Sequence, residues 1–197
     1  MPPVNQQRRE ALADAAIAII AAEGTHGLSH RAVDEAAAVP RGTTSNYFRS
    51  RDALLEAAVT RVVELHFAWI SELRAKRAAE LDRYSMQELL SYTVAEAVTT
   101  YRDRYRAMLE LLLEGTRRPE LHDVLARTVA GAADVIREVH RADGVEPSEE
   151  QIHLMRVCYI GVLMGYVALP EALQTLSPRD TAGILLNQVF TEDKAKI

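Results

Sequence analysis

The stretch that decides the fold runs from Gly27 to Leu55 and reads GLSHRAVDEAAAVPRGTTSNYFRSRDALL. Ser29 can cap a short helix that continues to about Ala36, because a serine hydroxyl accepts a hydrogen bond from a backbone amide of the first turn. The segment 37–40 predicts a tight connection, and a further short helix is expected over about 41–47. Two short helices joined by a tight turn, the second of them polar, predict a helix-turn-helix that binds DNA.

The polar residues of the second of these helices have the chemistry that DNA contacts require. Arginine can pair with guanine or with phosphate, asparagine can form two hydrogen bonds with adenine, and a threonine methyl can contact the thymine methyl. The residues concerned are Arg41, Thr43, Ser45, Asn46 and Tyr47. A helix this short and polar is not typical of a hydrophobic core, so we interpret it as a recognition helix.

Apolar residues recur at spacings of three and four along almost the whole chain, so the fold is expected to be all-α. A first helix over about 6–23 ends at Gly24, and after the deciding stretch one long amphipathic helix is expected from Ser50 to about Arg77. Its expected length is about 25 residues, or about 37 Å. Further helices are expected at 86–104, 106–114, 119–144, 149–169 and 178–191, which gives nine in all. Three of these starts carry caps, namely Ser85 with Glu88, Ser148 with Gln151, and Ser177 with Pro178.

Charge is unevenly distributed along the chain, whose net charge is −5. Residues 1–51 carry six arginines against five carboxylates and so sum to +1, which leaves −6 for the remainder. An N-terminal part with clustered arginines can approach phosphates while an acidic body faces away from them.

The deciding stretch resembles the N-terminal signature of the TetR family of transcriptional regulators. The matching positions are Leu28, Ser29, Val33, Ala37, Val39, Gly42, Tyr47, Phe48, Leu54 and Leu55. The departures are Asp34 where alanine is usual, Ala38 where glycine is usual, Pro40 where a capping serine is usual, and Ser45-Asn46 where aromatics are common. Ala38 costs about 1 kcal/mol if the turn demands a positive φ.

The resemblance implies a ligand-responsive repressor that binds a palindromic operator as a homodimer and is released by a small lipophilic effector. It places the DNA-binding domain at 1–50 and a helical effector-binding and dimerisation domain at 51–197. Phosphate-contacting roles fall to Ser29, Arg31, Tyr47 and Arg51, and base-reading or groove-lining roles to His30, Arg41, Gly42, Thr43, Ser45 and Asn46. The last two helices are expected to form the dimer, and Gly161 with Gly165 lets another helix approach closely.

Candidates for the effector site combine bulk with a few polar tips. They are His66, Trp69, Tyr92, Met108, Leu112, Met155 and Tyr159. The same residues at helical spacing also fit an ordinary core, and that alternative stays open. For Arg8 and Arg9, a phosphate-contacting arm and ordinary solvated charge are both open, and packing inside one chain also accounts for the two glycines.

Other functions lack a signature in the sequence. An enzyme would need a paired-carboxylate, nucleophile-base or glycine-rich phosphate motif, so neither catalysis nor a cofactor is expected. His26 and His30 lie on either side of a helix start, so no metal site is expected. A structural dimer with a vestigial helix-turn-helix is the remaining alternative.

The compartment is expected to be the cytoplasm. The single cysteine, Cys158, cannot form an internal disulfide, and Glu10 and Asp14 interrupt the one stretch that resembles an export signal. The longest uncharged apolar run, Val157 to Leu169, falls short of the roughly 20 residues that span a bilayer, so no membrane partner is expected.

Overall fold

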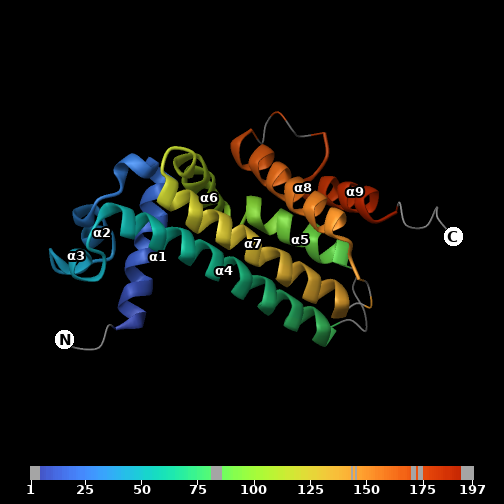
Figure 1. Cartoon of the computed structure of the whole chain (residues 1–197), viewed down its shortest axis with the longest axis horizontal. Helices are drawn as coiled ribbons and strands as arrows, with labels where there is room; N and C mark the ends of the chain where they lie inside the picture. The colour runs from blue at the N-terminus through green and yellow to red at the C-terminus, as the bar shows by residue number, and fades with distance from the viewer. Residues whose placement is uncertain are drawn as a thin grey trace. The chain divides into compact units, whose positions relative to one another are not determined.

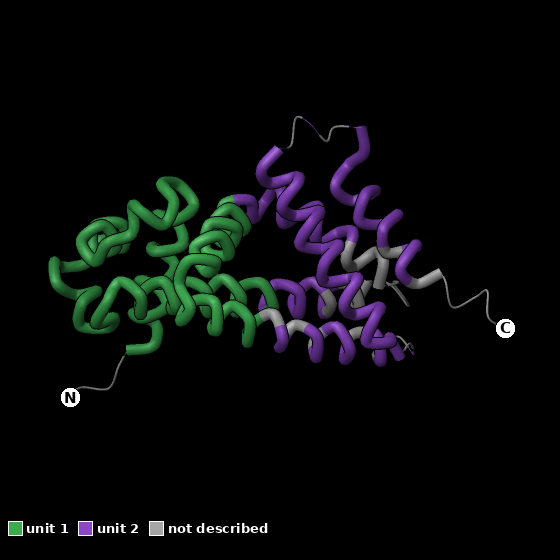
Figure 2. The backbone as a smooth tube through the Cα atoms, turned by 45° about the horizontal axis from the view of Figure 1, so that its top comes forward, with its two compact units in different colours: residues 1–67, 103–128 green, residues 68–102, 129–197 purple. Residues whose placement is uncertain are grey.

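The computed structural model describes residues 5–80, 86–142, 144, 146–169, 172 and 175–191. Within these ranges the chain forms nine α-helices and one 3₁₀-helix, without a strand, so the all-α prediction is confirmed (Figure 1). The helices fall into two compact units, residues 1–67 with 103–128 and residues 68–102 with 129–197 (Figure 2).

The first unit contains the N-terminal head, which we define as helices α1 to α3, together with elements from later in the chain. Its elements are α1 (Gln6–Glu23), the 3₁₀-helix η1 (Thr25–Gly27), α2 (His30–Ala36), α3 (Thr43–Tyr47), the first part of α4 (Arg51–Glu80), most of α6 (Arg102–Gly115) and the start of α7 (Pro119–Ala142). One apolar core joins them: Leu12, Val33 and Phe48 are buried in the same cluster as Leu111 of α6 and Leu125 of α7. Helices α6 and α7 therefore complete the core on which the head rests.

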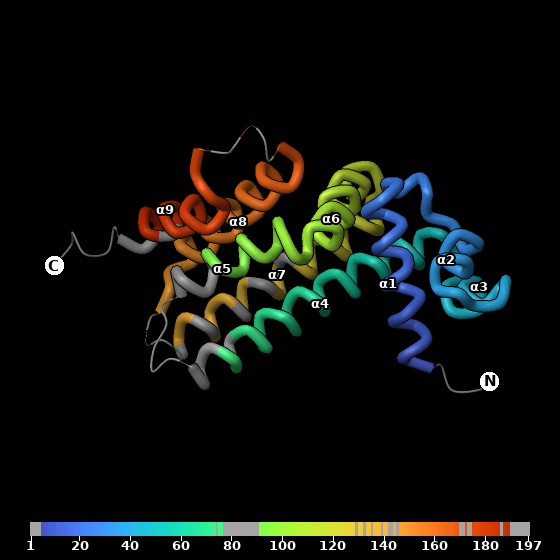
Figure 3. The backbone as a smooth tube through the Cα atoms, turned by 180° about the vertical axis from the view of Figure 1, so that it is seen from behind, coloured from blue at the N-terminus to red at the C-terminus, as the bar shows by residue number. Residues whose placement is uncertain are grey.

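The second unit is built around α5 (Met86–Val98), α8 (Glu149–Ala168) and α9 (Pro178–Thr191), which pack against one another (Figure 3). The hydroxyl of Tyr166 lies 2.8 Å from the Leu176 carbonyl and 2.7 Å from the Thr181 hydroxyl, which ties the start of α9 to α8. By length and composition alone α8 could cross a membrane, but a core helix passes the same test. Of the apolar window in α8, 33% is buried, and the buried residues include Met155.

The helix caps expected from the sequence are largely confirmed. Ser29 accepts from the Ala32 amide at 3.2 Å, and Ser50 accepts from the Ala53 amide at 3.1 Å. Ser148 and Gln151 form a capping box, and Ser177 accepts from the Asp180 amide at 3.0 Å. The predicted cap at Ser85 lies outside the described residues.

Several expected boundaries are wrong. The helix expected over 86–104 ends at Val98, and α6 begins at Arg102 instead of 106. The hydroxyl of Thr99 donates to the Ala95 carbonyl at 2.7 Å, a contact by which threonine competes with helical backbone hydrogen bonds. Helix α3 starts at Thr43, two residues later than expected, and α4 is a continuous helix of 30 residues. Helix α4 is therefore about 45 Å long and contributes to both units.

Candidate nucleic-acid interface

The turn between α2 and α3 contains two residues with left-handed backbone. Ala38 has φ 51°, and Gly42 has φ 87°. Glycine adopts this conformation without steric cost, whereas alanine loses about 1 kcal/mol there. The departure from the family pattern at Ala38 thus falls on a position that does require a positive φ, so other contacts must hold the turn.

Asp34 supplies those contacts from the neighbouring helix α2. Its Oδ1 accepts from the backbone amide of Thr44 at 2.7 Å and from the Thr44 hydroxyl at 2.6 Å. Its Oδ2 accepts from the backbone amide of Gly42 at 2.7 Å. The first amides of a helix have no partner within the helix, and Gly42 at the N-cap of α3 has no side chain to offer one. Asp34 therefore caps the recognition helix from eight residues earlier in the chain.

The electrostatics of Asp34 agree with this role. The side chain is buried, with 3% of its surface exposed. Burial by itself would raise the pKa of the carboxyl, but the hydrogen bonds from Thr44 and Gly42, with a smaller contribution from His30, outweigh it and hold the pKa below its ordinary value. Asp34 is thus a carboxylate at neutral pH, and a charged acceptor forms stronger hydrogen bonds than a neutral one.

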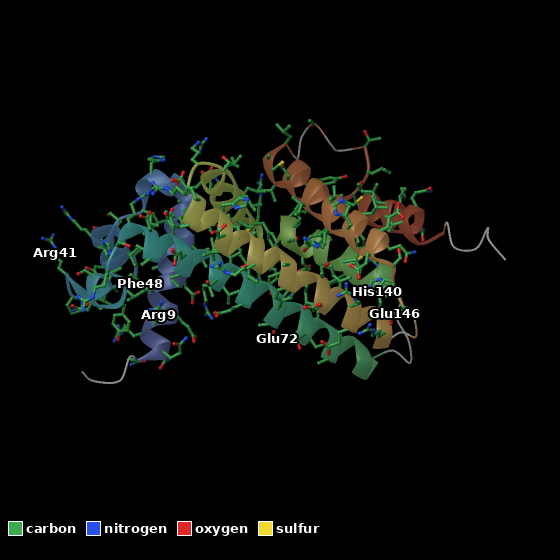
Figure 4. All side chains as sticks on the ribbon, viewed as in Figure 1. Arg9, Arg41, Phe48, Glu72, His140 and Glu146 are labelled. Carbon is green, nitrogen blue, oxygen red and sulfur yellow. The ribbon has the colours of Figure 1, made fainter. Side chains whose placement is uncertain are left out.

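The cap determines which side chains of α3 remain available. Thr44 is fully buried, whereas Arg41 and Asn46 are exposed, and Arg41 projects outward beside α3 (Figure 4). Thr43, Ser45 and Tyr47 are partly buried. The Thr43 hydroxyl donates to the Pro40 carbonyl at 2.6 Å and the Ser45 hydroxyl to the Gly42 carbonyl at 3.0 Å. Both hydroxyl oxygens can still accept hydrogen bonds.

Two residues with expected DNA roles also make internal contacts. His30 donates through Nε2 to the Phe48 carbonyl at 2.7 Å. Arg51 donates through Nε to the Leu28 carbonyl at 3.2 Å and through a second nitrogen to the Thr25 carbonyl. The Arg51 contacts join the start of α4 to η1 and its C-cap, and the His30 contact joins α2 to the C-cap of α3. Their roles toward DNA stay predictions, as do those of the exposed Ser29 and Arg31.

Arg9 attaches α1 to the end of the recognition helix. Its guanidinium lies 4.5 Å from the centre of the Phe48 ring, and it donates to the Tyr47 carbonyl at 3.3 Å (Figure 4). A cation over an aromatic face is attracted by the negative charge of the ring face. Arg9 is therefore a structural contact within the first unit, whereas Arg8 is exposed.

The expected effector residues are divided between the two units. His66, Met108 and Leu112 belong to the first unit, and Trp69, Tyr92, Met155 and Tyr159 belong to the second. Met155 is buried and the others are partly buried. Burial, with a smaller contribution from Arg104, lowers the pKa of His66 to about 4, and its Nδ1 lies 2.5 Å from the Tyr105 hydroxyl. His66 is therefore neutral at physiological pH.

One face of α8 exposes apolar side chains. Leu154, Val157, Gly161 and Met164 share this face by their helical spacing, and 54% of Val157 and 43% of Met164 are exposed. A Cβ added at Gly161 would meet nothing within 4 Å, so packing inside one chain does not require glycine at this position. Gly165, by contrast, is partly buried.

Sequence comparisons place both parts of the chain among known regulators. Residues 12–58 match the family model described as bacterial regulatory proteins, tetR family, and residues 81–192 match the tetracyclin repressor-like C-terminal domain. The HTH-type transcriptional regulator BetI of Paraburkholderia xenovorans (strain LB400) is 30% identical over 114 residues. That match covers 58% of this chain and 57% of the relative, little more than half of its length.

Solved structures with the same fold extend over nearly the whole chain. The multidrug binding protein EbrR complexed with imidazole is 25% identical, with a TM-score of 0.68, over 92% of this chain and 94% of that one. A member of the TetR family from Streptomyces coelicolor A3 is 24% identical, with a TM-score of 0.71, over 93% and 98% of the two chains.

Proposed function

Because the chain belongs to the TetR family, we propose that it is a DNA-binding transcriptional regulator, namely a cytoplasmic, ligand-responsive repressor that binds a palindromic operator as a homodimer. In this proposal a small lipophilic effector releases the protein from DNA. The observation that carries it is the recognition helix α3, which Asp34 caps from within the protein while Arg41 and Asn46 remain exposed.

The proposed contacts with DNA follow from this arrangement. Arg41 and Asn46 are the exposed residues best suited to read base edges, and Ser29, Arg31 and Tyr47 are assigned to phosphates. A two-fold dimer presents its two recognition helices to half-sites about one helical turn apart, ~34–36 Å, or a multiple of it. The operator should therefore be an inverted repeat.

The exposed apolar face of α8 supports the proposed dimer. Leu154, Val157 and Met164 lie on it beside Gly161, and Ile184 of α9 is also half exposed. Contiguous apolar surface of this kind usually marks an interface in a protein that folds in water. A second copy of the same two helices would cover it and form a four-helix bundle.

The coupling between effector and DNA is assigned to α4 and α6. Helix α4 runs unbroken from Arg51, directly after the head, past Trp69 in the second unit. Helix α6 contacts η1 beside the head: the carboxylate of Glu114 accepts a hydrogen bond from the Thr25 hydroxyl at 3.4 Å. Arg118, which follows α6, pairs with Asp52 at 2.7 Å. A hundredfold loss of operator affinity needs an effector that favours one orientation of these helices by ~2.7 kcal/mol.

The multidrug binding protein EbrR, solved with imidazole, supports an effector that is a small molecule. A gel shift of the purified protein with the DNA upstream of its own coding sequence tests the proposal. The expected result is saturable binding that prefers this DNA over a scrambled duplex and weakens with salt, with a further loss in Arg41→Ala. Binding with no sequence preference would instead support a structural dimer with a vestigial helix-turn-helix.

A further inference from the structure

Arg156 is a cation on the buried face of α8. By helical spacing it lies on the side of Ile152 and Leu163, whose exposed fractions are 1% and 7%, and away from the exposed face that carries Val157 and Gly161. Its Nε is fully buried, whereas the residue as a whole is partly exposed. Part of the side chain is therefore accessible to solvent, although its Nε is not.

The guanidinium of Arg156 has no partner in the part of the chain that the structure describes. Its buried Nε makes no hydrogen bond, and Arg156 belongs to none of the ion pairs among the described residues. Two other arginines of this unit differ: Arg137 pairs with Glu149 at 2.6 Å, and Arg141 pairs with Glu146 at 2.7 Å. A buried donor without an acceptor is unfavourable, and more so when it is charged, so the position of Arg156 suits an acceptor from outside the chain.

We propose that Arg156 binds the oxyanion head group of the effector, which is therefore an amphiphile with a carboxylate or phosphate at one end and an apolar body. This proposal rests on the proposed function, because it names the chemical class of the effector. The planar guanidinium matches both oxyanions and forms charge-assisted hydrogen bonds with them. The apolar side chains of Ile152, Met155 and Leu163 are chemically suited to the body of such a ligand.

A matched pair of fluorescent probes tests the oxyanion directly. 8-Anilinonaphthalene-1-sulfonate carries an oxyanion, and N-phenyl-1-naphthylamine has the same aromatic body without it. Titrations of the full chain should show that Arg156→Met weakens binding of the sulfonate probe at least tenfold and leaves binding of the neutral probe within twofold. The matched control is Arg179→Met, because Arg179 is exposed in the first turn of α9. Equal loss for both probes, or no loss for the sulfonate probe, would overturn the proposal.

Two further measurements separate ligand binding from a structural role. The melting temperature of ligand-free Arg156→Met should equal or exceed that of the wild type, because methionine fills a similar space without a buried donor that lacks an acceptor. A lower value would show that Arg156 stabilises the fold. Displacement of the sulfonate probe from wild type by decanoate, decyl phosphate and 1-decanol identifies the head group. Stronger displacement by decanoate or by decyl phosphate selects carboxylate or phosphate, and equal displacement by 1-decanol contradicts an oxyanion site.

Failure of the proposed function gives a different pattern. If the wild-type protein did not bind its upstream DNA specifically, regulation would be refuted while the probe comparison still reported on Arg156. If DNA bound specifically and the sulfonate probe showed no dependence on Arg156, only the chemical class of the effector would be wrong.

Discussion

Replacing Asp34 by asparagine tests whether a buried carboxylate positions the recognition helix. Asparagine has almost the same shape and keeps one oxygen for the Thr44 amide and hydroxyl. Its NH2 group then faces the Gly42 amide, which in the wild type donates to Oδ2 at 2.7 Å, so a donor meets a donor. The variant therefore loses the charge, loses one of the three hydrogen bonds and weakens the other two.

The size of the effect follows from these contacts. A hydrogen bond to a charged group contributes about 1.5–3 kcal/mol, and loss of a helix N-cap costs about 1 kcal/mol. The two values describe overlapping interactions, so we expect α3 to lose about 2 kcal/mol of local stability. If binding must restore the helix, this corresponds to a loss of operator affinity of about 30-fold for each head.

The sign of the change separates this explanation from simple electrostatics. Removal of a negative charge near DNA phosphates, without any change of structure, strengthens binding. The positioning role predicts weaker binding. Glu35→Gln is the matched control, because it removes the same charge from an exposed residue of α2 and is expected to bind the operator as tightly as the wild type or slightly more tightly.

Fluorescence anisotropy with a labelled operator, measured over a range of salt concentrations, gives the affinity and its salt slope. Amide hydrogen exchange at Thr44 and Ser45 reports whether α3 opens more often, and it should be faster in Asp34→Asn than in Glu35→Gln. The reasoning would be refuted if Asp34→Asn bound the operator as tightly as the wild type and kept the same exchange rates at these two amides.

The remaining predictions concern stability, assembly and the response to effector. Because the pKa of His66 is about 4 in the folded protein and about 6.5 in the unfolded chain, the unfolded state binds the extra proton between these values. The free energy of unfolding should therefore fall as pH is lowered from about 6.5 to about 4, by up to about 1.4 kcal/mol per pH unit, and denaturant titrations of His66→Gln should lack this component. Gly161→Leu should loosen the dimer by about 1–3 kcal/mol, because a bulky side chain overpacks a close helix contact. Light scattering would show the change in mass, and Gly131→Leu is the control at another helical glycine where an added Cβ meets nothing; equal dimer mass in the two variants would place the interface elsewhere. Trp69→Ala should weaken effector binding or the release of DNA that it causes, and if a gel shift with added effector shows full binding and full release, Trp69 has no part in the coupling.

The sequence by itself determined the elements that depend on neighbouring residues. Ser29, Ser148 and Ser177 each cap the helix that follows, and each accepts from an amide three residues later. Helical periodicity depends in the same way on residues three and four apart, so the all-α fold and the helix-turn-helix could be predicted from one sequence. The family pattern also pointed to the positive φ observed at Ala38, because glycine is usual at that turn position in the family.

The tertiary structure alone decided the partners of the polar side chains. In the sequence Asp34 is only a departure from the family pattern, because its acceptor role depends on amides eight and ten residues away that the turn brings beside it. The carbonyl partners of Arg51 lie 23 and 26 residues away. Arg156 stands out only because packing buries its Nε without a hydrogen-bond partner among the described residues. Periodicity reports which face of a helix is buried, whereas hydrogen bonds and ion pairs depend on distances of a few ångströms between segments that only packing brings together.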